Sequence, residues 1–220
     1  KKGEFNKAYE YSSFLNKKNY TPLQKLLNQI IFNWVKVEYK NLNYKDAKEI
    51  FQSISPKYKN IKKINNVFLN CYFDTYLTDT KFQNLIQERE TDFSRYTFFY
   101  VNYLIKKDLP KKADLILASK LKEVPRNLLL NQVHLDLKKK KQSYLETKFD
   151  CKNISNIIAE LFYITANALS TQNLYSFSNF YINLAKYLNQ NFYSYNTLLA
   201  ENFMMTGDNK KAKKFFLLLK

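Results

Sequence analysis

The chain has 220 residues, 45% of them apolar, which is enough to bury a core, and its formal net charge is +17. It contains only two glycines and four prolines. These are too few for the tight turns of a β-rich fold, or for the glycine-rich loops that hold dinucleotides and phosphates. We therefore expect an all-α fold and no nucleotide cofactor.

The positive charge alone does not identify a nucleic-acid binder. Nearly all of it is lysine, and Arg89, Arg95 and Arg126 are the only arginines, although arginine is the residue suited to bidentate recognition of bases and phosphates. The lysines accompany many Asn, Ile, Tyr and Phe residues, a mixture that compositional drift of a genome also produces. We favour drift and keep RNA binding as the alternative.

All four prolines are predicted to stand at helix starts, where the missing N–H would have no partner in a helix. The clearest start is at Pro22, with Thr21 as N-cap and Gln24 placed to complete a capping box. The same interpretation applies to Pro56, Pro110 and Pro125. The chain is therefore predicted to form short helices in series.

The helical pattern lapses after residue 137. We expect residues 138–156 to form a loop between an N-terminal segment, residues 1–137, and a C-terminal segment, residues 157–220. In the C-terminal segment, Ala185 and Leu219 end two amphipathic helices 34 residues apart, and Phe162 and Asn196 open the preceding helices at the same offset. This period predicts a repeated pair of helices.

Residues 198–216 resemble the tetratricopeptide repeat. The first-helix packing positions hold Leu199, Ala200 and Phe203, Gly207 stands at the turn, and the second-helix positions hold Ala212, Phe216 and Leu219. Small residues at Ala200 and Ala212 let the paired helices approach, and the phenylalanine rings fill the remaining volume. With Ala-Glu-Leu-Phe at residues 159–162, residues 156–219 look like a group of uncharacterised bacterial tetratricopeptide proteins.

Weaker copies of the pattern precede this one. Near the start, Gly3 is predicted at a turn and Ala8 at a packing position; in residues 43–51, Ala47 follows a helix that bears Trp34, and Leu42 replaces the glycine. Residues 109–117 keep Ala113, whereas the register between about 55 and 125 stays open. Ala166 and Ala185 are the other predicted repeat positions.

The resemblance implies a right-handed α-solenoid of antiparallel helix pairs, a tetratricopeptide-like superhelix that binds a peptide or protein partner through a concave groove. The first helix of each pair would line that groove. The candidate groove residues are Asn33, Lys36, Lys40, Arg95, Asn102, Lys106, Asn167 and Glu201. Because this set is mainly basic, we expect an acidic or extended peptide as the ligand.

No motif in the sequence indicates an enzyme, and we predict no catalytic residue, metal site or cofactor. His134 is the single histidine and has no second ligand near it in the sequence. Glu88 and Glu90 stand two residues apart, which on a helix points them to different faces, so surface charge suffices to explain them. Lysine clusters, such as the one at residues 57–63, are interpreted as solvated.

Two further expectations concern association and location. The terminal repeats lack a polar cap, which predicts fraying or self-association through the ends. No apolar run reaches the length that crosses a bilayer. Because the sequence begins Lys-Lys-Gly without methionine, we expect that an upstream segment is missing, and the sequence predicts no location.

Overall fold

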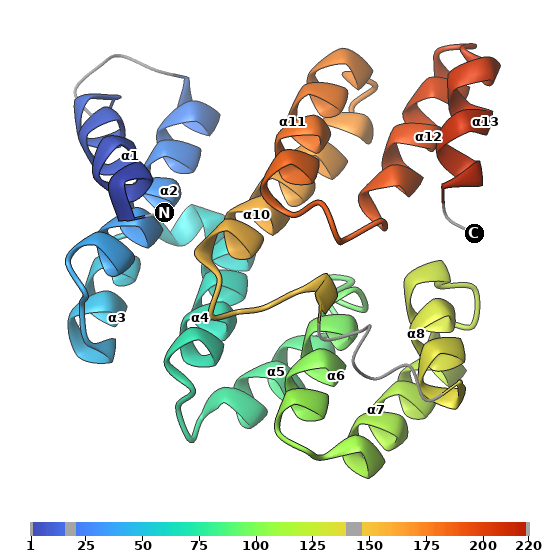
Figure 1. The fold of residues 1–220 in the computed structure, drawn as a ribbon, viewed down its shortest axis with the longest axis horizontal. Coiled ribbons are helices and arrows are strands. Elements are labelled where there is room, and N and C mark those ends of the chain that lie inside the picture. The colour runs from blue at the N-terminus through green and yellow to red at the C-terminus, as the bar shows by residue number, and fades with distance from the viewer. Residues whose placement is uncertain (1, 16–20, 140–146, 219–220) are drawn as a thin grey trace. The chain divides into compact units, whose positions relative to one another are not determined.

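The structure is a computed structural model that describes residues 2–15, 21–139 and 147–218, and in that part of the chain every regular element is a helix (Figure 1). The all-α prediction is therefore confirmed. In chain order the helices are α1 (Lys2–Leu15), α2 (Pro22–Tyr39), α3 (Tyr44–Gln52), the 3₁₀ helix η1 (Pro56–Tyr58), α4 (Lys59–Phe73), α5 (Thr78–Ile86), α6 (Tyr96–Lys106), α7 (Pro110–Glu123), α8 (Leu128–Lys138), α10 (Ile154–Ser170), α11 (Tyr175–Leu188), α12 (Tyr195–Met205) and α13 (Asn209–Leu217).

The chain divides into two compact units, residues 1–100 and 101–220, and the boundary falls inside α6. The segment 138–156, which we expected to be a loop between two parts of the chain, lies within the second unit. There α8 ends at Lys138 and α10 begins at Ile154, while residues 140–146 lie outside the described residues.

Helix starts follow the proline prediction at three of the four positions. Thr21 caps α2 with the expected capping box, because its side chain accepts from the Gln24 N–H and the Gln24 side chain accepts from the Thr21 N–H at 3.0 Å. Pro56 opens η1 and Pro110 opens α7. The prediction is wrong for Pro125, because α8 starts after Asn127. The side-chain oxygen of Asn127 accepts from the N–H of Leu130, and proline has no side-chain oxygen that could cap a helix in this way.

The core of the first unit is built around the single tryptophan. Trp34 on α2 is 0% exposed, and its ring packs against Phe51 of α3 with the centroids 4.8 Å apart. Its indole Nε1 donates to Asn65 Oδ1 of α4 at 2.8 Å, so the buried N–H is satisfied. Three helices, α2, α3 and α4, are thus joined at one side chain.

The core of the second unit joins α10, α11 and α12 through Asn202, which is fully buried. The Asn202 amide donates to Ser178 Oγ of α11 at 2.7 Å, and its oxygen accepts from Ser170 Oγ of α10 at 2.6 Å. Elsewhere in this unit, Lys148 forms a buried ion pair with Asp136 of α8 at 3.1 Å. Both polar centres are paired, as burial requires.

Several helices end in the same left-handed turn. The described non-glycine residues with positive φ are Asn41, Asp74, Asp108 and Asn173, and Gly207 shares this conformation with φ of +79°. They follow α2, α4, α6, α10 and α12 respectively. The spacings between successive members are 33, 34, 65 and 34 residues. The period of about 34 residues, inferred from the C-terminal segment, is therefore present in the backbone along most of the chain.

Each of these turns is a Schellman motif, in which the left-handed residue and the residue after it donate back to the last turn of the helix. After α12, Gly207 N donates to Met204 O at 3.1 Å and Asp208 N donates to Phe203 O at 2.8 Å. After α2, the left-handed residue is Asn41, so the prediction that Leu42 replaces the turn glycine is wrong by one position. Asparagine tolerates this conformation better than leucine does.

The expected turn at Gly3 is also corrected, because this residue lies in the first turn of α1. A glycine is compatible with helical as well as left-handed φ, so its presence alone does not decide between them. Among the described helices, none combines the length and the hydropathy that crossing a bilayer requires.

Candidate functional site

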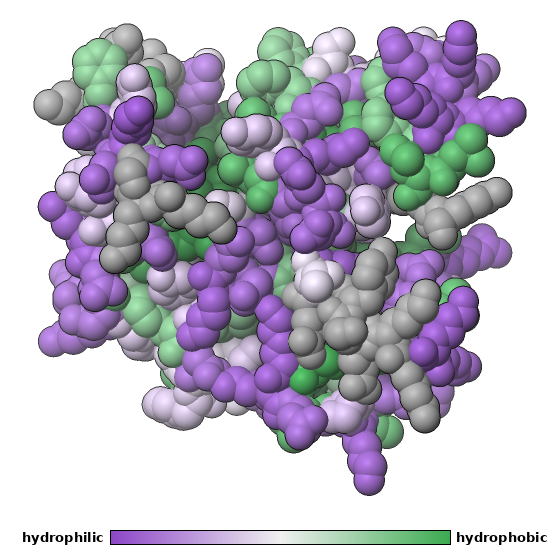
Figure 2. Space-filling view, viewed as in Figure 1, coloured by the Kyte–Doolittle hydropathy of each residue, from purple (hydrophilic) through white to green (hydrophobic). Residues whose placement is uncertain are grey.

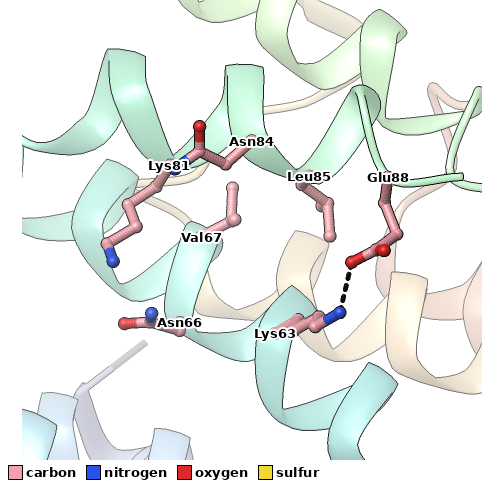
Figure 3. Close-up of a pocket in the computed structure, with 7 residues that line it drawn as sticks. All are labelled: Lys63, Asn66, Val67, Lys81, Asn84, Leu85 and Glu88. Carbon is pink, nitrogen blue, oxygen red and sulfur yellow. Dashed lines mark hydrogen bonds and ion pairs between the residues drawn. The ribbon is translucent and has the colours of Figure 1, made fainter.

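A hollow of about 170 Å³ lies between α4 and α5 in the first unit (Figure 3). From α4 it is lined by Lys63, Asn66 and Val67, and from α5 and the turn after it by Lys81, Asn84, Leu85 and Glu88. Spacings of three and four residues place each set on one helix face. The two helices therefore present a lysine, an asparagine and an apolar side chain each.

One end of the hollow is closed by an ion pair. The Lys63 ammonium binds a carboxylate oxygen of Glu88, which stands just after the C-cap residue of α5 (Figure 3). The hydrogen bond from Lys63 lowers the pKa of Glu88, and the charge of Lys59 acts in the same direction. Glu88 is therefore a carboxylate at neutral pH. The Lys63 and Glu88 side chains remain 41% and 24% exposed, so water reaches the pair.

The other end carries donors without acceptors. Lys81 and Asn66 lie at the end away from the ion pair, with Val67 and Leu85 between the two ends (Figure 3). Asn66 Oδ1 accepts from Asn70 Nδ2 at 3.2 Å, which leaves its amide N–H groups available. Among the described residues, none forms an ion pair or a hydrogen bond with Lys81. This end can bind an anion without breaking an existing contact.

Three lysines cluster at the start of α4, beside the hollow. Lys59, Lys62 and Lys63 fall among the first five residues of α4, where the helix dipole is also positive and acidic residues are usually preferred. Lys62 donates to the Gln52 carbonyl at 2.7 Å, and Lys59 pairs with Glu90 at 3.1 Å. The surrounding backbone and carboxylates hold these lysines near one another in spite of their repulsion.

Burial excludes one of the predicted groove residues of the first unit. Asn33 is 5% exposed and its Nδ2 donates to the Ile50 carbonyl at 3.1 Å, so the expectation that it lines a groove is corrected. Lys36 is half-buried on α2, whereas Lys40 is exposed, with its ammonium 4.8 Å from the centre of the Tyr39 ring. The Arg95 guanidinium lies 5.8 Å from the Phe99 ring centre.

In the second unit, burial again corrects one candidate. Asn102 is 4% exposed, because it stands on the inner face of α6. Lys106 pairs with Asp150 at 3.1 Å, and Asn167 is exposed on α10. Glu201 on α12 is exposed on one side, yet partial burial raises the pKa of its carboxyl. Lys106 and Asn167 are therefore the two candidate donors of this unit that reach the surface.

Most of the predicted packing residues are buried, but Phe216 on α13 is 39% exposed, so the expectation that its ring fills the core is corrected. Ala200 and Ala212, on the contacting helices α12 and α13, are both buried, as is Trp34. Ala8 on α1 is only half-buried. The other predicted packing alanines are fully buried: Ala47, Ala113, Ala166 and Ala185. Leu219, the last predicted packing residue, lies outside the described residues.

The hollow was missed by the sequence interpretation, which treated residues 57–63 as a solvated lysine cluster and Glu88 as surface charge. A signal was present: Lys63 and Asn66-Val67 match Lys81 and Asn84-Leu85 in spacing and residue type. Two such faces on neighbouring helices predict a polar hollow with an apolar floor. The open register between residues 55 and 125 hid the pairing of α4 with α5.

Other chemistry has less support. His134 is half-buried on α8, and its Nδ1 has no hydrogen-bond partner among the described residues. Within the same part of the chain, no group of three or more His, Cys, Asp or Glu side chains is arranged to hold a metal ion. The α4–α5 hollow is therefore the candidate site.

Comparison with known proteins adds no relative: no protein-family model, no curated protein and no solved structure matches this chain.

Proposed function

We propose that this chain is a protein-binding scaffold of tetratricopeptide-like helix pairs, arranged as a right-handed α-solenoid. The support is the turn that recurs after α2, α4, α6, α10 and α12 with spacings near 34 residues. Buried small residues accompany it: Ala47, Ala113 and Ala212 each lie five or six residues after a left-handed residue. Ser178, also fully buried, holds the same position after Asn173. Repeats of this kind complete their cores against their neighbours and present extended binding surfaces.

The ligand we propose is an acidic peptide segment, bound first at the α4–α5 hollow. Lys81 and the Asn66 amide supply donors that no described residue uses, and a carboxylate is the peptide group that fits a cation beside an amide. Val67 and Leu85 form an apolar floor for a neighbouring aliphatic side chain. The net charge of +17 would speed the approach of such a partner at low salt.

The size of the hollow argues for a peptide rather than a metabolite. Sites for small molecules usually enclose roughly 300–1,000 Å³ and bury most of the ligand. This hollow has about 170 Å³ and is open to solvent on one side, which suits one or two side chains of a longer partner. Affinity would then come from several such contacts along the scaffold.

The test is fluorescence anisotropy with a labelled peptide containing Glu-Leu-Val-Glu, beside its Gln-Leu-Val-Gln analogue and a single-stranded RNA oligonucleotide. We expect the acidic peptide to bind and the analogue to bind much more weakly. If the RNA instead binds more tightly, with a steep dependence on salt concentration, the nucleic-acid alternative replaces this proposal.

Charge reversal locates the contact. Lys81→Glu is expected to weaken binding of the acidic peptide roughly tenfold, because it replaces an attractive contact by a repulsive one. Lys45→Glu on α3 is the control: like Lys81, this lysine stands on a nine-residue helix, but it is exposed and does not line the hollow. Equal losses in the two variants, with unchanged circular dichroism, would mean that only net charge matters and would refute binding at the hollow.

The predicted groove lysines on α2 can be tested with the same peptide. A double variant, Lys36→Glu with Lys40→Glu, changes the α2 face without touching the hollow. Loss of binding in this variant and none in Lys81→Glu would move the site from the hollow to α2.

A further inference from the structure

Glu88 is the one carboxylate among the residues that line the hollow, and it forms an ion pair with Lys63, one of the two lysines there. It stands in the turn beyond α5 rather than within the helix, so it can leave Lys63 without unwinding α5. At the other end, no carboxylate of the described residues pairs with Lys81. The lysine at one end of the hollow is therefore already paired with Glu88, whereas the lysine at the other end is paired with no described carboxylate.

We propose that Glu88 is an internal competitor for the ligand, holding Lys63 until a second carboxylate of the partner displaces it. The partner segment would then carry two carboxylates separated by apolar residues, one bound by Lys81 and Asn66 and one by Lys63. This inference rests on the proposed function, because it assumes that an acidic peptide binds at the hollow. It adds the spacing of the charges and a built-in limit on affinity.

The arrangement of the hollow supports the two-carboxylate ligand. Lys63 and Lys81 come from different helices and point to opposite ends, with Val67 and Leu85 between them (Figure 3). The Lys81 end offers a cation and the Asn66 amide, and the Lys63 end offers a second cation (Figure 3). A segment that begins and ends with an acidic residue matches this order of charge, apolar floor and charge.

Displacement is feasible because the Lys63–Glu88 pair is open to water on both side chains. Exposed ion pairs contribute little, so a carboxylate delivered by a peptide already held at Lys81 can compete. Displaced Glu88 would remain near Lys59, whose charge already contributes to its lowered pKa. The cost of releasing Glu88 is therefore reduced without any change in the helices.

The test compares the wild type with Glu88→Gln, using the Glu-Leu-Val-Glu peptide and a version in which one glutamate is replaced by glutamine. Removing the competitor should tighten binding of the two-carboxylate peptide roughly two- to fivefold, the size expected for an exposed pair. The one-carboxylate peptide should gain less. Glu49→Gln on α3 is the control, because it removes the same charge from an exposed position away from the hollow.

A second pair of variants separates competition from a general charge effect or a folding defect. In a Lys63→Gln background, Glu88→Gln should have no further effect on affinity, because the contested cation is gone. Glu88→Asp, which keeps the charge on a shorter arm, should lie between the wild type and Glu88→Gln. Thermal unfolding of each variant establishes that it is folded.

The outcomes distinguish the two proposals. If the wild type does not bind the acidic peptide, the proposed function fails and this inference fails with it. If the wild type and Lys81→Glu bind the peptide equally, the peptide does not bind at the hollow and this inference fails. If the wild type binds and Lys81→Glu weakens binding, but Glu88→Gln leaves the affinity unchanged or lowers it, only the competitor role is overturned. A lowered affinity would mean that Glu88 contacts the ligand directly.

Discussion

Replacing Gly207 by alanine tests whether the left-handed turn after α12 positions α13. Gly207 has φ of +79°, and a Cβ added there meets no heavy atom within 4 Å, so no steric clash contributes. The two backbone hydrogen bonds of the turn are also retained. The remaining cost is the strain of an L-residue in the left-handed region, about 1–2 kcal/mol. Alanine restricts the unfolded chain and offsets roughly 0.5 kcal/mol of this.

We therefore expect Gly207→Ala to lower the free energy of unfolding by about 1 kcal/mol. The other glycine provides a control of opposite sign: Gly3 lies in α1, where alanine is the better helix former, so Gly3→Ala should not destabilise. Asn41→Gly should also cause no loss, because φ there is 48° and glycine removes the strain.

Urea and thermal unfolding, followed by far-ultraviolet circular dichroism, measure these differences. A loss of about 1 kcal/mol should lower the midpoint by roughly 2–4 °C in a protein of this size. If Gly207→Ala is as stable as the wild type, the turn does not impose the left-handed conformation and the reasoning is refuted. If Gly3→Ala is the damaging variant instead, the sequence-based placement of Gly3 in a turn was right and its place in α1 is wrong.

Two further predictions concern the core and the C-terminal surface. Asn65→Ala should destabilise the first unit by about 2 kcal/mol, because it leaves the buried indole N–H of Trp34 without an acceptor. The emission of the single tryptophan reports the midpoint of unfolding. An unchanged midpoint would contradict this prediction. The self-association predicted from the sequence is favoured by Leu217 and Leu218 of the C-terminal region, which are 53% and 52% exposed. Figure 2 shows apolar side chains at the surface in the region of α12 and α13. Light scattering should show concentration-dependent oligomers that Leu217→Lys reduces, and a monomer at every concentration would count against it.

Much of the local structure was predictable because it depends on neighbours in the chain. Thr21 and Gln24 form their capping box within one turn of helix, and Gly207 ends α12 through its own backbone freedom. The scarcity of glycine and proline excluded turn-rich folds without any knowledge of packing. The burial of Ala200 and Ala212 also followed from a pattern within a short segment.

The turn predictions failed where residues other than glycine also adopt the left-handed backbone conformation. Asn41, Asp74 and Asp108 adopt the left-handed conformation that was sought at glycines, since asparagine and aspartate also tolerate it. Asn33 and Asn102 were assigned to the groove by the register of the repeats, whereas both are buried. A polar side chain is buried where a partner is available, and for Asn33 that partner, the Ile50 carbonyl, is 17 residues away in the sequence.

The sequence by itself determined that this chain is helical and that a unit of about 34 residues recurs, because helix caps, turns and apolar spacing act over a few residues. Tertiary structure decided which lysines share a site. Lys63 meets Glu88 across 25 residues of sequence, and the hollow between α4 and α5 exists only because those helices pack together. Charge and hydropathy along the chain do not encode that contact, since electrostatic interaction depends on distance in space.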